Sequence, residues 1–362
     1  MKRLPRLMAS AALVLPLIAS AQTTQRFTAD KTNEYALVYS LPMTLVDITV
    51  ETEHTIKEPG EFFNYATRHL GLTDNKVIRQ PEHTVAIKSI TITPRGAADP
   101  ANRWQVQFKN GSAPTMLLMP DGVPLSINAD VDAPEAPVLP KAIAAAPTPL
   151  EAPAAREAIT EEMSRSTTLG RKAQAAANRI FELRERRNDI FSGDAETMPP
   201  DGRATELVLA GLSAQEAALT AMFTGTVKTF TEVSTVTFTP TKQDESKVLL
   251  ARVSPLEGIV AKDDLSGIPL YLNYEILTHG KLPTNEKGEV KKFPKGGVAY
   301  TIPGTARISL TFNGKIIGSA DIDVAQLGAT FGIDPGMFTD KKAPAYVEFS
   351  PVTGAIVSLG TK

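Results

Sequence analysis

A single long helical stretch interrupts a chain that is otherwise patterned as short strands. Between residues 156 and 225, apolar side chains recur at steps of three and four residues, as at Ile180 and Leu183, which is the spacing of an amphipathic helix. A turn-rich segment over residues 193–202 divides the stretch into two runs. The pattern therefore predicts a helical hairpin over residues 156–225, with one apolar stripe that docks against a sheet.

The segments on both sides of this stretch are predicted to be β-rich. In residues 22–130, Val46, Ile48 and Val50 alternate with polar residues, as in an antiparallel sheet with one solvated face. A short helix over Glu61–Leu70 is predicted to end at Gly71. The strands expected in this region cover residues 35–40, 43–53, 84–92 and 104–108.

Glycine-containing dipeptides predict where the strands turn. Asn110-Gly111 and Asp121-Gly122 predict two successive turns and a three-stranded meander over residues 104–127. In residues 226–362, Asn313-Gly314 predicts the turn of the clearest hairpin. The predicted fold class is α+β, with antiparallel β-rich regions before and after a central helical hairpin. The sequence leaves open whether the two β-rich regions form one sheet.

Residues 131–155 have a different composition from the segments around them. They contain six prolines among alanines and few large side chains, so they cannot build a core of their own. The composition predicts an extended linker or surface strap between the first β-rich region and the helices.

The first 21 residues are typical of a secretory signal peptide. Lys2, Arg3 and Arg6 precede an apolar run, and Ala19-Ser20-Ala21 is a small-residue cleavage site. The apolar run is shorter than the roughly 20 residues that span a bilayer. We therefore expect an exported protein, cleaved near Ala21, that is soluble and either periplasmic or on the cell surface.

Charge and cysteine content exclude several functional classes. The formal net charge is -2, and removal of the three cations of residues 1–21 makes it -5. A mildly acidic chain is a poor partner for nucleic acid, which binds basic surfaces. The chain has no cysteine, which excludes disulfides and thiolate chemistry. No stretch after residue 21 predicts a transmembrane span.

Several short sequence segments spread along the chain together resemble those of one protein family. They are Tyr39-Ser40-Leu41-Pro42, Phe63-Asn64-Tyr65-Ala66, Ile190-Phe191-Ser192-Gly193-Asp194, Asp264-Leu265-Ser266-Gly267, Tyr300-Thr301-Ile302-Pro303-Gly304, Val324-Ala325-Gln326-Leu327-Gly328 and Pro351-Val352-Thr353-Gly354-Ala355. In these segments the chain resembles an uncharacterised family of exported Bacteroidetes proteins that is defined by a domain of unknown function. The resemblance covers nearly all of the chain after residue 21. It implies no activity, cofactor or site residue.

No catalytic or metal-binding constellation stands out in the sequence. The four histidines have no metal-ligand spacing, and no serine lies in a G-x-S-x-G elbow. We therefore predict no catalytic residue, no metal and no cofactor.

Four residues are candidates for binding at the surface, and each has a structural alternative. Asp194 and Asp201 lie in the helix connection, where Asp201 is also placed to cap the second helix. Asp264 is a candidate carboxylate whose structural alternative is a solvated side chain. Trp104 is suited either to stacking on a sugar ring or to packing at a sheet edge. A lysine-rich loop fits either an anionic surface or plain solvent; its lysines are Lys287, Lys291, Lys292 and Lys295.

These observations leave two functional hypotheses. The first is an exported cell-envelope protein of non-enzymatic role that binds a partner protein or a surface polymer. The second is a carboxylate-dependent hydrolase of an envelope or dietary polymer. Two carboxylates converging at about 5 to 9 Å in a deep pocket would favour the hydrolase. The sequence makes no prediction of oligomeric state.

Overall fold

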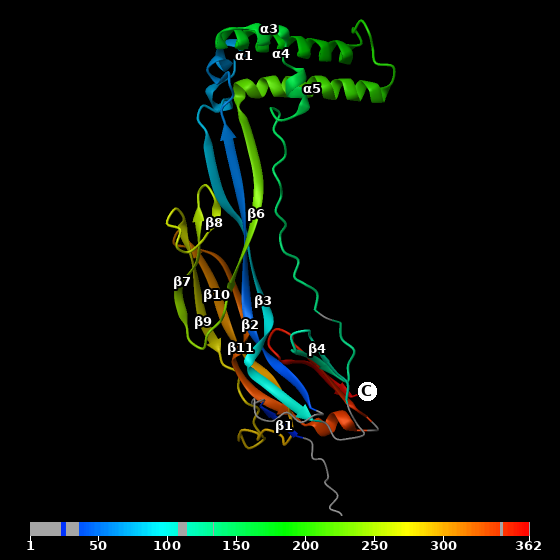
Figure 1. The fold of residues 1–362 in the computed structure, drawn as a ribbon, viewed down its shortest axis with the longest axis vertical. Coiled ribbons are helices and arrows are strands. Elements are labelled where there is room, and N and C mark those ends of the chain that lie inside the picture. The colour runs from blue at the N-terminus through cyan, green and yellow to red at the C-terminus, as the bar shows by residue number, and fades with distance from the viewer. Residues whose placement is uncertain (1–22, 27–35, 108–113, 133, 341–342, 362) are drawn as a thin grey trace, which may run out of the picture.

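The computed structural model describes residues 23–26, 36–107, 114–132, 134–340 and 343–361. The predicted signal peptide and the predicted turn at Asn110-Gly111 lie outside the described residues. The molecule is long and narrow, with helices at one end and the C-terminus near the other (Figure 1). Three antiparallel sheets lie between these ends.

Two long strands form the axis of the molecule. Strands β2 (Leu37–Glu58) and β3 (Glu82–Gln107) pair antiparallel over nearly their whole length. Strand β6 (Thr226–Phe238) pairs with the other side of β2, and β1 (Thr23–Arg26) pairs with the end of β3. The resulting sheet has the order β1-β3-β2-β6.

The prediction that this region contains several short strands is wrong. Residues 35–40 and 43–53 belong largely to β2, and residues 84–92 and 104–108 belong largely to β3. The β2–β3 register shifts between Ser40 and Pro42. A bulge of this kind lets a strand continue past a proline that cannot donate a ladder hydrogen bond.

The connection from β2 to β3 contains short helices. They are η1 (Phe63–Tyr65), α1 (Ala66–Leu70) and η2 (Asp74–Lys76). Gly71 ends α1 in the left-handed conformation, at φ 63°. The predicted short helix and its glycine stop are therefore confirmed.

The second sheet packs against the β1-β3-β2-β6 sheet. Its order is β11-β10-β9-β7-β8, and its strands are β7 (Glu245–Ser254), β8 (Gly258–Val260), β9 (Ile268–Thr278), β10 (Val298–Phe312) and β11 (Lys315–Ile333). The predicted hairpin is confirmed, because Asn313 and Gly314 join β10 to β11 with φ values of 48° and 73°. The alternating residues Val46, Ile48 and Val50 of β2 form a buried core with the second sheet.

The third sheet joins segments from both ends of the chain. Its order is β13-β12-β5-β4, and its strands are β4 (Met116–Leu118), β5 (Pro124–Ile127), β12 (Ala345–Phe349) and β13 (Ile356–Thr361). The predicted meander is wrong, because β4 and β5 pair with each other but not with β3. The predicted turn at Asp121-Gly122 does join β4 to β5. A short 3₁₀ helix, η3 (Pro335–Thr339), precedes β12.

The helices cluster at the far end of β2, β3 and β6 (Figure 1). They are α2 (Pro153–Glu157), α3 (Glu161–Arg165), α4 (Leu169–Ser192) and α5 (Gly202–Thr224). We call α1 to α5 the helical head. Ile180 and Leu183 of α4 share a buried core with Leu219 and Phe223 of α5 and with Phe62. The prediction that the apolar stripe docks against a sheet is wrong, because this core is built from the helices and the connections between them. With its antiparallel sheets, the fold is α+β.

The proline-rich segment runs alongside the body from the third sheet to the helical head (Figure 1). We call residues 134–149 the strap. At Ile143 the strap pairs with β6, since the Thr231 N–H donates to Ile143 O and the Ile143 N–H donates to Thr231 Oγ1, both at 3.0 Å. Near the head, Lys228 forms an ion pair with Glu151 at 2.9 Å.

Candidate functional site

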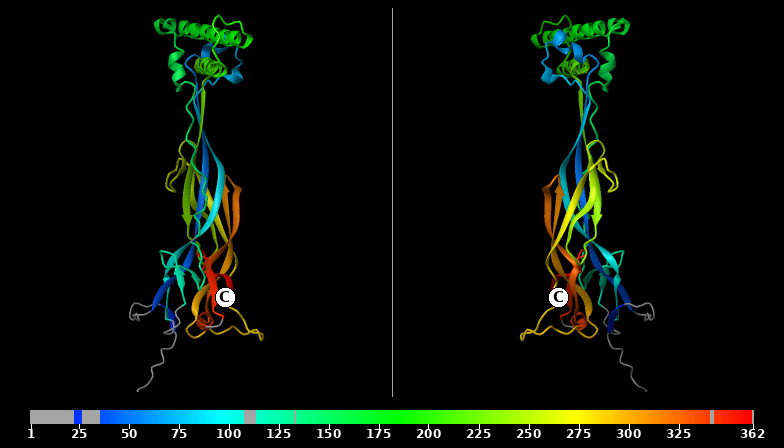
Figure 2. Two further views of the ribbon diagram at one scale, coloured as in Figure 1. Left: turned by 90° about the vertical axis from the view of Figure 1, so that its right-hand side faces the viewer. Right: turned by 90° about the vertical axis from the view of Figure 1, so that its left-hand side faces the viewer.

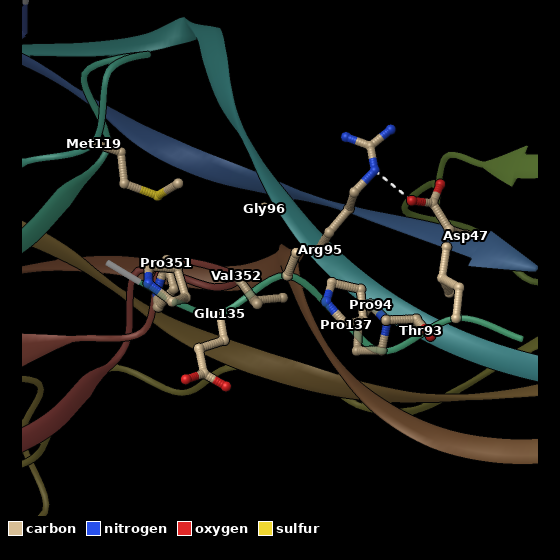
Figure 3. Close-up of a pocket in the computed structure, with 13 residues that line it drawn as sticks. Asp47, Thr93, Pro94, Arg95, Gly96, Met119, Glu135, Pro137, Pro351 and Val352 are labelled. Atoms are coloured by element: carbon tan, nitrogen blue, oxygen red, sulfur yellow. Dashed lines mark hydrogen bonds and ion pairs between the residues drawn. The ribbon is translucent and has the colours of Figure 1, made fainter. Parts of the chain in front are cut away.

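A groove of about 320 Å³ lies under the strap on the outer face of the β1-β3-β2-β6 sheet. Figure 3 shows its lining, in which β2 and β3, the strap and the turn after β12 meet. Its apolar lining is provided by Pro94, Met119, Pro134, Pro137, Leu139, Pro351 and Val352. A concave, mainly apolar site of this size is within the usual range for small ligands or side chains.

Strand alternation decides which residues face the groove. In β2, Val46 and Ile48 point into the core, so the residue between them, Asp47, points outward. The turn after β12 comes close to β3 at Gly96, where an added Cβ would lie 1.9 Å from Pro351 O. A side chain at residue 96 would therefore displace one wall of the groove.

The charged residues of the groove are largely engaged with each other. Arg95 Nε contacts Asp47 Oδ2 at 2.6 Å, and Thr237 Oγ1 donates to Asp47 Oδ1 at 2.6 Å. Glu135, the other carboxylate of the described lining, comes from the strap, and its carboxylate points away from Asp47 (Figure 3). Both oxygens of Asp47 thus already accept hydrogen bonds, and the pair is not arranged for acid–base chemistry. The groove is suited to holding an apolar group.

Two of the sequence-predicted binding residues lie at the helical head. The Asp201 carboxylate caps α5, because its Oδ1 accepts from the Ala204 N–H at 2.7 Å. Asp194 is exposed in the turn that follows Gly193, which ends α4 at φ 82°. The capping interpretation of Asp201 is confirmed, and a binding role of either residue stays a prediction.

The other two predicted residues lie elsewhere, so the four candidates do not form one site. Asp264 Oδ1 accepts from the Ser266 N–H at 2.8 Å, and this bond lowers the pKa of the Asp264 carboxyl. Trp104, near the opposite end of β3 from the head, is half-buried and stacks on Phe293 with 5.9 Å between ring centroids.

The structure brings together two histidines that sequence spacing did not connect. His54 Nδ1 and His83 Nε2 are 3.3 Å apart, and Phe230 stacks on His54. Glu232 Oε2 lies 3.5 Å from His54 Nε2. Burial lowers the pKa of His54, and His83 lowers it further, although Glu232 opposes this shift. Only the long register of β2 with β3 and β6 could have revealed this cluster. Among the described residues, no group of three or more histidines and carboxylates is placed to hold a metal.

Comparison with family models assigns the chain to a family. The model described as "Domain of unknown function (DUF4831)" matches residues 35–357. The chain belongs to the DUF4831 family. The resemblance to a family without assigned function is thereby confirmed, whereas bacterial source and export stay predictions. Neither curated proteins nor solved structures give a match.

In this DUF4831 chain, several of the sequence segments that resemble the family lie together beside the groove. The Thr44 N–H donates to Gln326 Oε1 at 3.0 Å, and Gln326 Nε2 donates to Thr44 O at 2.7 Å. Thr44 Oγ1 donates to Val352 O at 3.2 Å, and the Thr301 N–H donates to Gly354 O at 3.0 Å. The bonds of Gln326 join β11 to β2. The other two fix the turn after β12 to β2 and β10, and with it the wall that Val352 contributes to the groove.

The helical head of this DUF4831 chain leaves large apolar side chains in solvent. Phe191 is 71% exposed and Leu207 is 66% exposed, and Met198 and Val208 are also exposed. All four belong to the turn between α4 and α5 or to the helix turns beside it. Within the described residues, α5 is the one helix long and apolar enough to cross a membrane, and 22% of its apolar window is buried. The head therefore has a buried core but exposes large apolar side chains around the turn between α4 and α5.

Proposed function

We propose that this protein is an exported, non-enzymatic binding protein of the cell envelope that docks a partner protein through its helical head. The observation that carries the proposal is the cluster of exposed apolar residues around the turn between α4 and α5. Large apolar side chains gathered in one exposed part of a protein can mark an interaction site. We call Phe191, Met198, Leu207 and Val208 the apolar tip.

The shape of the molecule supports this proposal. The apolar tip lies at the end of a long body, away from the third sheet and the C-terminus (Figure 1). Helix α4 is held against α5 by Glu216, which contacts Arg184 at 2.6 Å and also binds Arg187. A firmly held helical pair presents its apolar side chains with little loss of conformational freedom on binding, which favours affinity.

The carboxylates of the groove give little support to the alternative function, a hydrolase. A polymer hydrolase needs a free carboxylate pair at about 5 to 9 Å. Asp47 is already bound by Arg95 and Thr237. Export and an envelope location rest on the sequence of residues 1–21 and belong to the proposal.

The test is recovery of a partner from an envelope extract by the protein starting at Gln22. The double variant Phe191→Asp/Leu207→Asp places two charges on the apolar tip, and Val357→Asp places one on an exposed residue of β13. We expect a discrete partner with the wild type and with Val357→Asp, and at least a tenfold loss with the tip variant. Equal recovery with all three proteins contradicts a role of the tip. Cleavage of an envelope polymer by the purified protein, without specific recovery, supports the hydrolase instead.

A further inference from the structure

The loop between β9 and β10 is a small hairpin that projects from the body. Thr284 and Val290 form a β-bridge. Asn285 closes the tip, because its N–H donates to Glu289 O at 2.8 Å and its Oδ1 accepts from the Glu289 N–H at 2.9 Å. Figure 2 shows the loop in gold, extending sideways near the end opposite the helical head. We call residues 281–295 the lysine arm.

An aromatic contact anchors the lysine arm. The Phe293 ring lies parallel to Trp104, at an interplanar angle of 7°, and edge-on to Phe331 at a centroid distance of 6.1 Å. Gly332 makes room for it, because an added Cβ there would lie 2.8 Å from the Phe293 ring. The arm is therefore rooted at a defined position, and Trp104 is a residue that positions it.

The lysine arm concentrates positive charge on an acidic chain. It contains five lysines and two glutamates, a net charge of +3, whereas the whole chain carries -2. Within the described part of the chain, none of the five ammonium groups has a carboxylate within 4.0 Å. The lysines are Lys281, Lys287, Lys291, Lys292 and Lys295, and all five are exposed. In contrast, the Glu289 carboxylate accepts from Asn285 Nδ2.

Two exposed aliphatic side chains lie next to these lysines in the sequence. Leu282 follows Lys281, and Val290 precedes Lys291; Val290 is 57% exposed and Leu282 is also exposed. Lysines favour the phosphates of an anionic surface. Exposed aliphatic side chains beside them favour the boundary between lipid headgroups and acyl chains. A hydrated acidic polysaccharide offers nothing to the aliphatic side chains, so the combination favours lipid.

We propose that the lysine arm docks on the surface of an anionic phospholipid bilayer, with its ammonium groups at headgroup phosphates and Leu282 and Val290 at the acyl boundary. This inference goes beyond the proposed function, because it concerns the opposite end of the molecule and a different partner. A protein bound in this way at one end presents its helical head away from the lipid surface.

The test is co-flotation of the full chain starting at Gln22 with vesicles. Vesicles of phosphatidylcholine alone are compared with vesicles that also contain phosphatidylglycerol. Lys291→Glu/Lys292→Glu reverses two charges on the arm, and Lys141→Glu/Lys315→Glu makes the same change in net charge elsewhere. Val290→Ser removes the aliphatic contact without a change of charge. Circular dichroism and thermal unfolding establish that each variant is folded.

We expect binding to the phosphatidylglycerol vesicles that is lost in high salt, since the attraction is electrostatic. Binding should fall at least tenfold in the arm charge variant, fall severalfold in Val290→Ser, and persist in the control variant. The proposal is overturned by equal binding to phosphatidylcholine alone, by equal loss in the control, by no binding, or by binding only to a soluble acidic polysaccharide. Recovery of a partner through the apolar tip is measured separately, so either proposal can fail without the other.

Discussion

Tyr39 links two parts of the fold through one buried hydroxyl. The Ala299 N–H donates to Tyr39 Oη at 2.8 Å, and Tyr39 Oη donates to Ala299 O at 3.3 Å. The residue is 1% exposed, and burial raises the pKa of its hydroxyl strongly. The hydroxyl therefore stays protonated and connects β2 to β10 across sheets.

Replacement of Tyr39 by Phe should test this link. The change leaves the Ala299 N–H buried without a partner, which costs about 1–3 kcal/mol of unfolding free energy. Urea unfolding measures the loss. Tyr346→Phe is the matched control, since the Tyr346 hydroxyl has no hydrogen bond among the described residues. Equal effects of the two variants would contradict the assigned role.

His54 should make stability depend on pH. In the folded protein burial lowers the pKa of His54, whereas in the unfolded chain a histidine binds a proton near pH 6.5. The unfolded state therefore gains protons first, and unfolding free energy should fall as pH drops from about 6.5 toward the lowered pKa. Above that window the contribution is constant.

The pH dependence is checked by urea unfolding at about pH 7.5 and about pH 5.5. His54→Gln should lose less stability between the two pH values than the wild type. His279→Gln, a change at an exposed histidine, should behave like the wild type. An unchanged pH dependence in His54→Gln would show that the His54 cluster has no such effect.

At the scale of single elements, the start of α5 depends on Asp201. Asp201→Ala removes the cap on the Ala204 N–H and should lower the unfolding free energy by about 1 kcal/mol. Asp201→Asn keeps a side-chain oxygen at the same place and should cost much less. Thermal unfolding of both variants measures the difference. If Ala and Asn cost the same, the carboxylate charge rather than the cap is what matters.

The strap should loosen when its hydrogen bonds to β6 are broken. Ile143→Pro removes the N–H that donates to Thr231 Oγ1, because proline has no backbone donor. Hydrogen exchange at the Thr231 N–H should then become faster, by tenfold or more. Ala142→Pro, at a residue whose N–H makes no hydrogen bond in the described part of the chain, is the control. Unchanged exchange in Ile143→Pro would mean that the strap is held elsewhere.

At the scale of the whole molecule, the sequence predicted helix ends and turns, which depend on neighbouring residues, better than it predicted the pairing of distant strands. Gly71 ends a helix and Asp201 begins one through bonds within a few residues, so the sequence predicted both correctly. The Asn313-Gly314 turn was predictable for the same reason. Such signals act on the chain around them and need no partner.

Pairing between distant segments was not predictable in the same way. Alternation in β2 shows that Val46, Ile48 and Val50 face a core, but it does not say that β3 and β6 flank the strand. The pairing of β5 with β12 likewise depends on contacts across most of the chain. The contact of His54 with His83 arises from these registers. The groove also needs the strap and the turn after β12, so sequence spacing missed both.

The most direct test of the central claim, that the apolar tip docks a partner protein, is site-specific photocrosslinking in cells that make the protein. A photoreactive phenylalanine analogue is placed at residue 207 in the tip or, as a control, at the exposed residue 357 of β13. The account predicts one discrete adduct from residue 207 and none of the same mass from residue 357. No adduct from residue 207, or the same adduct from both positions, would contradict it.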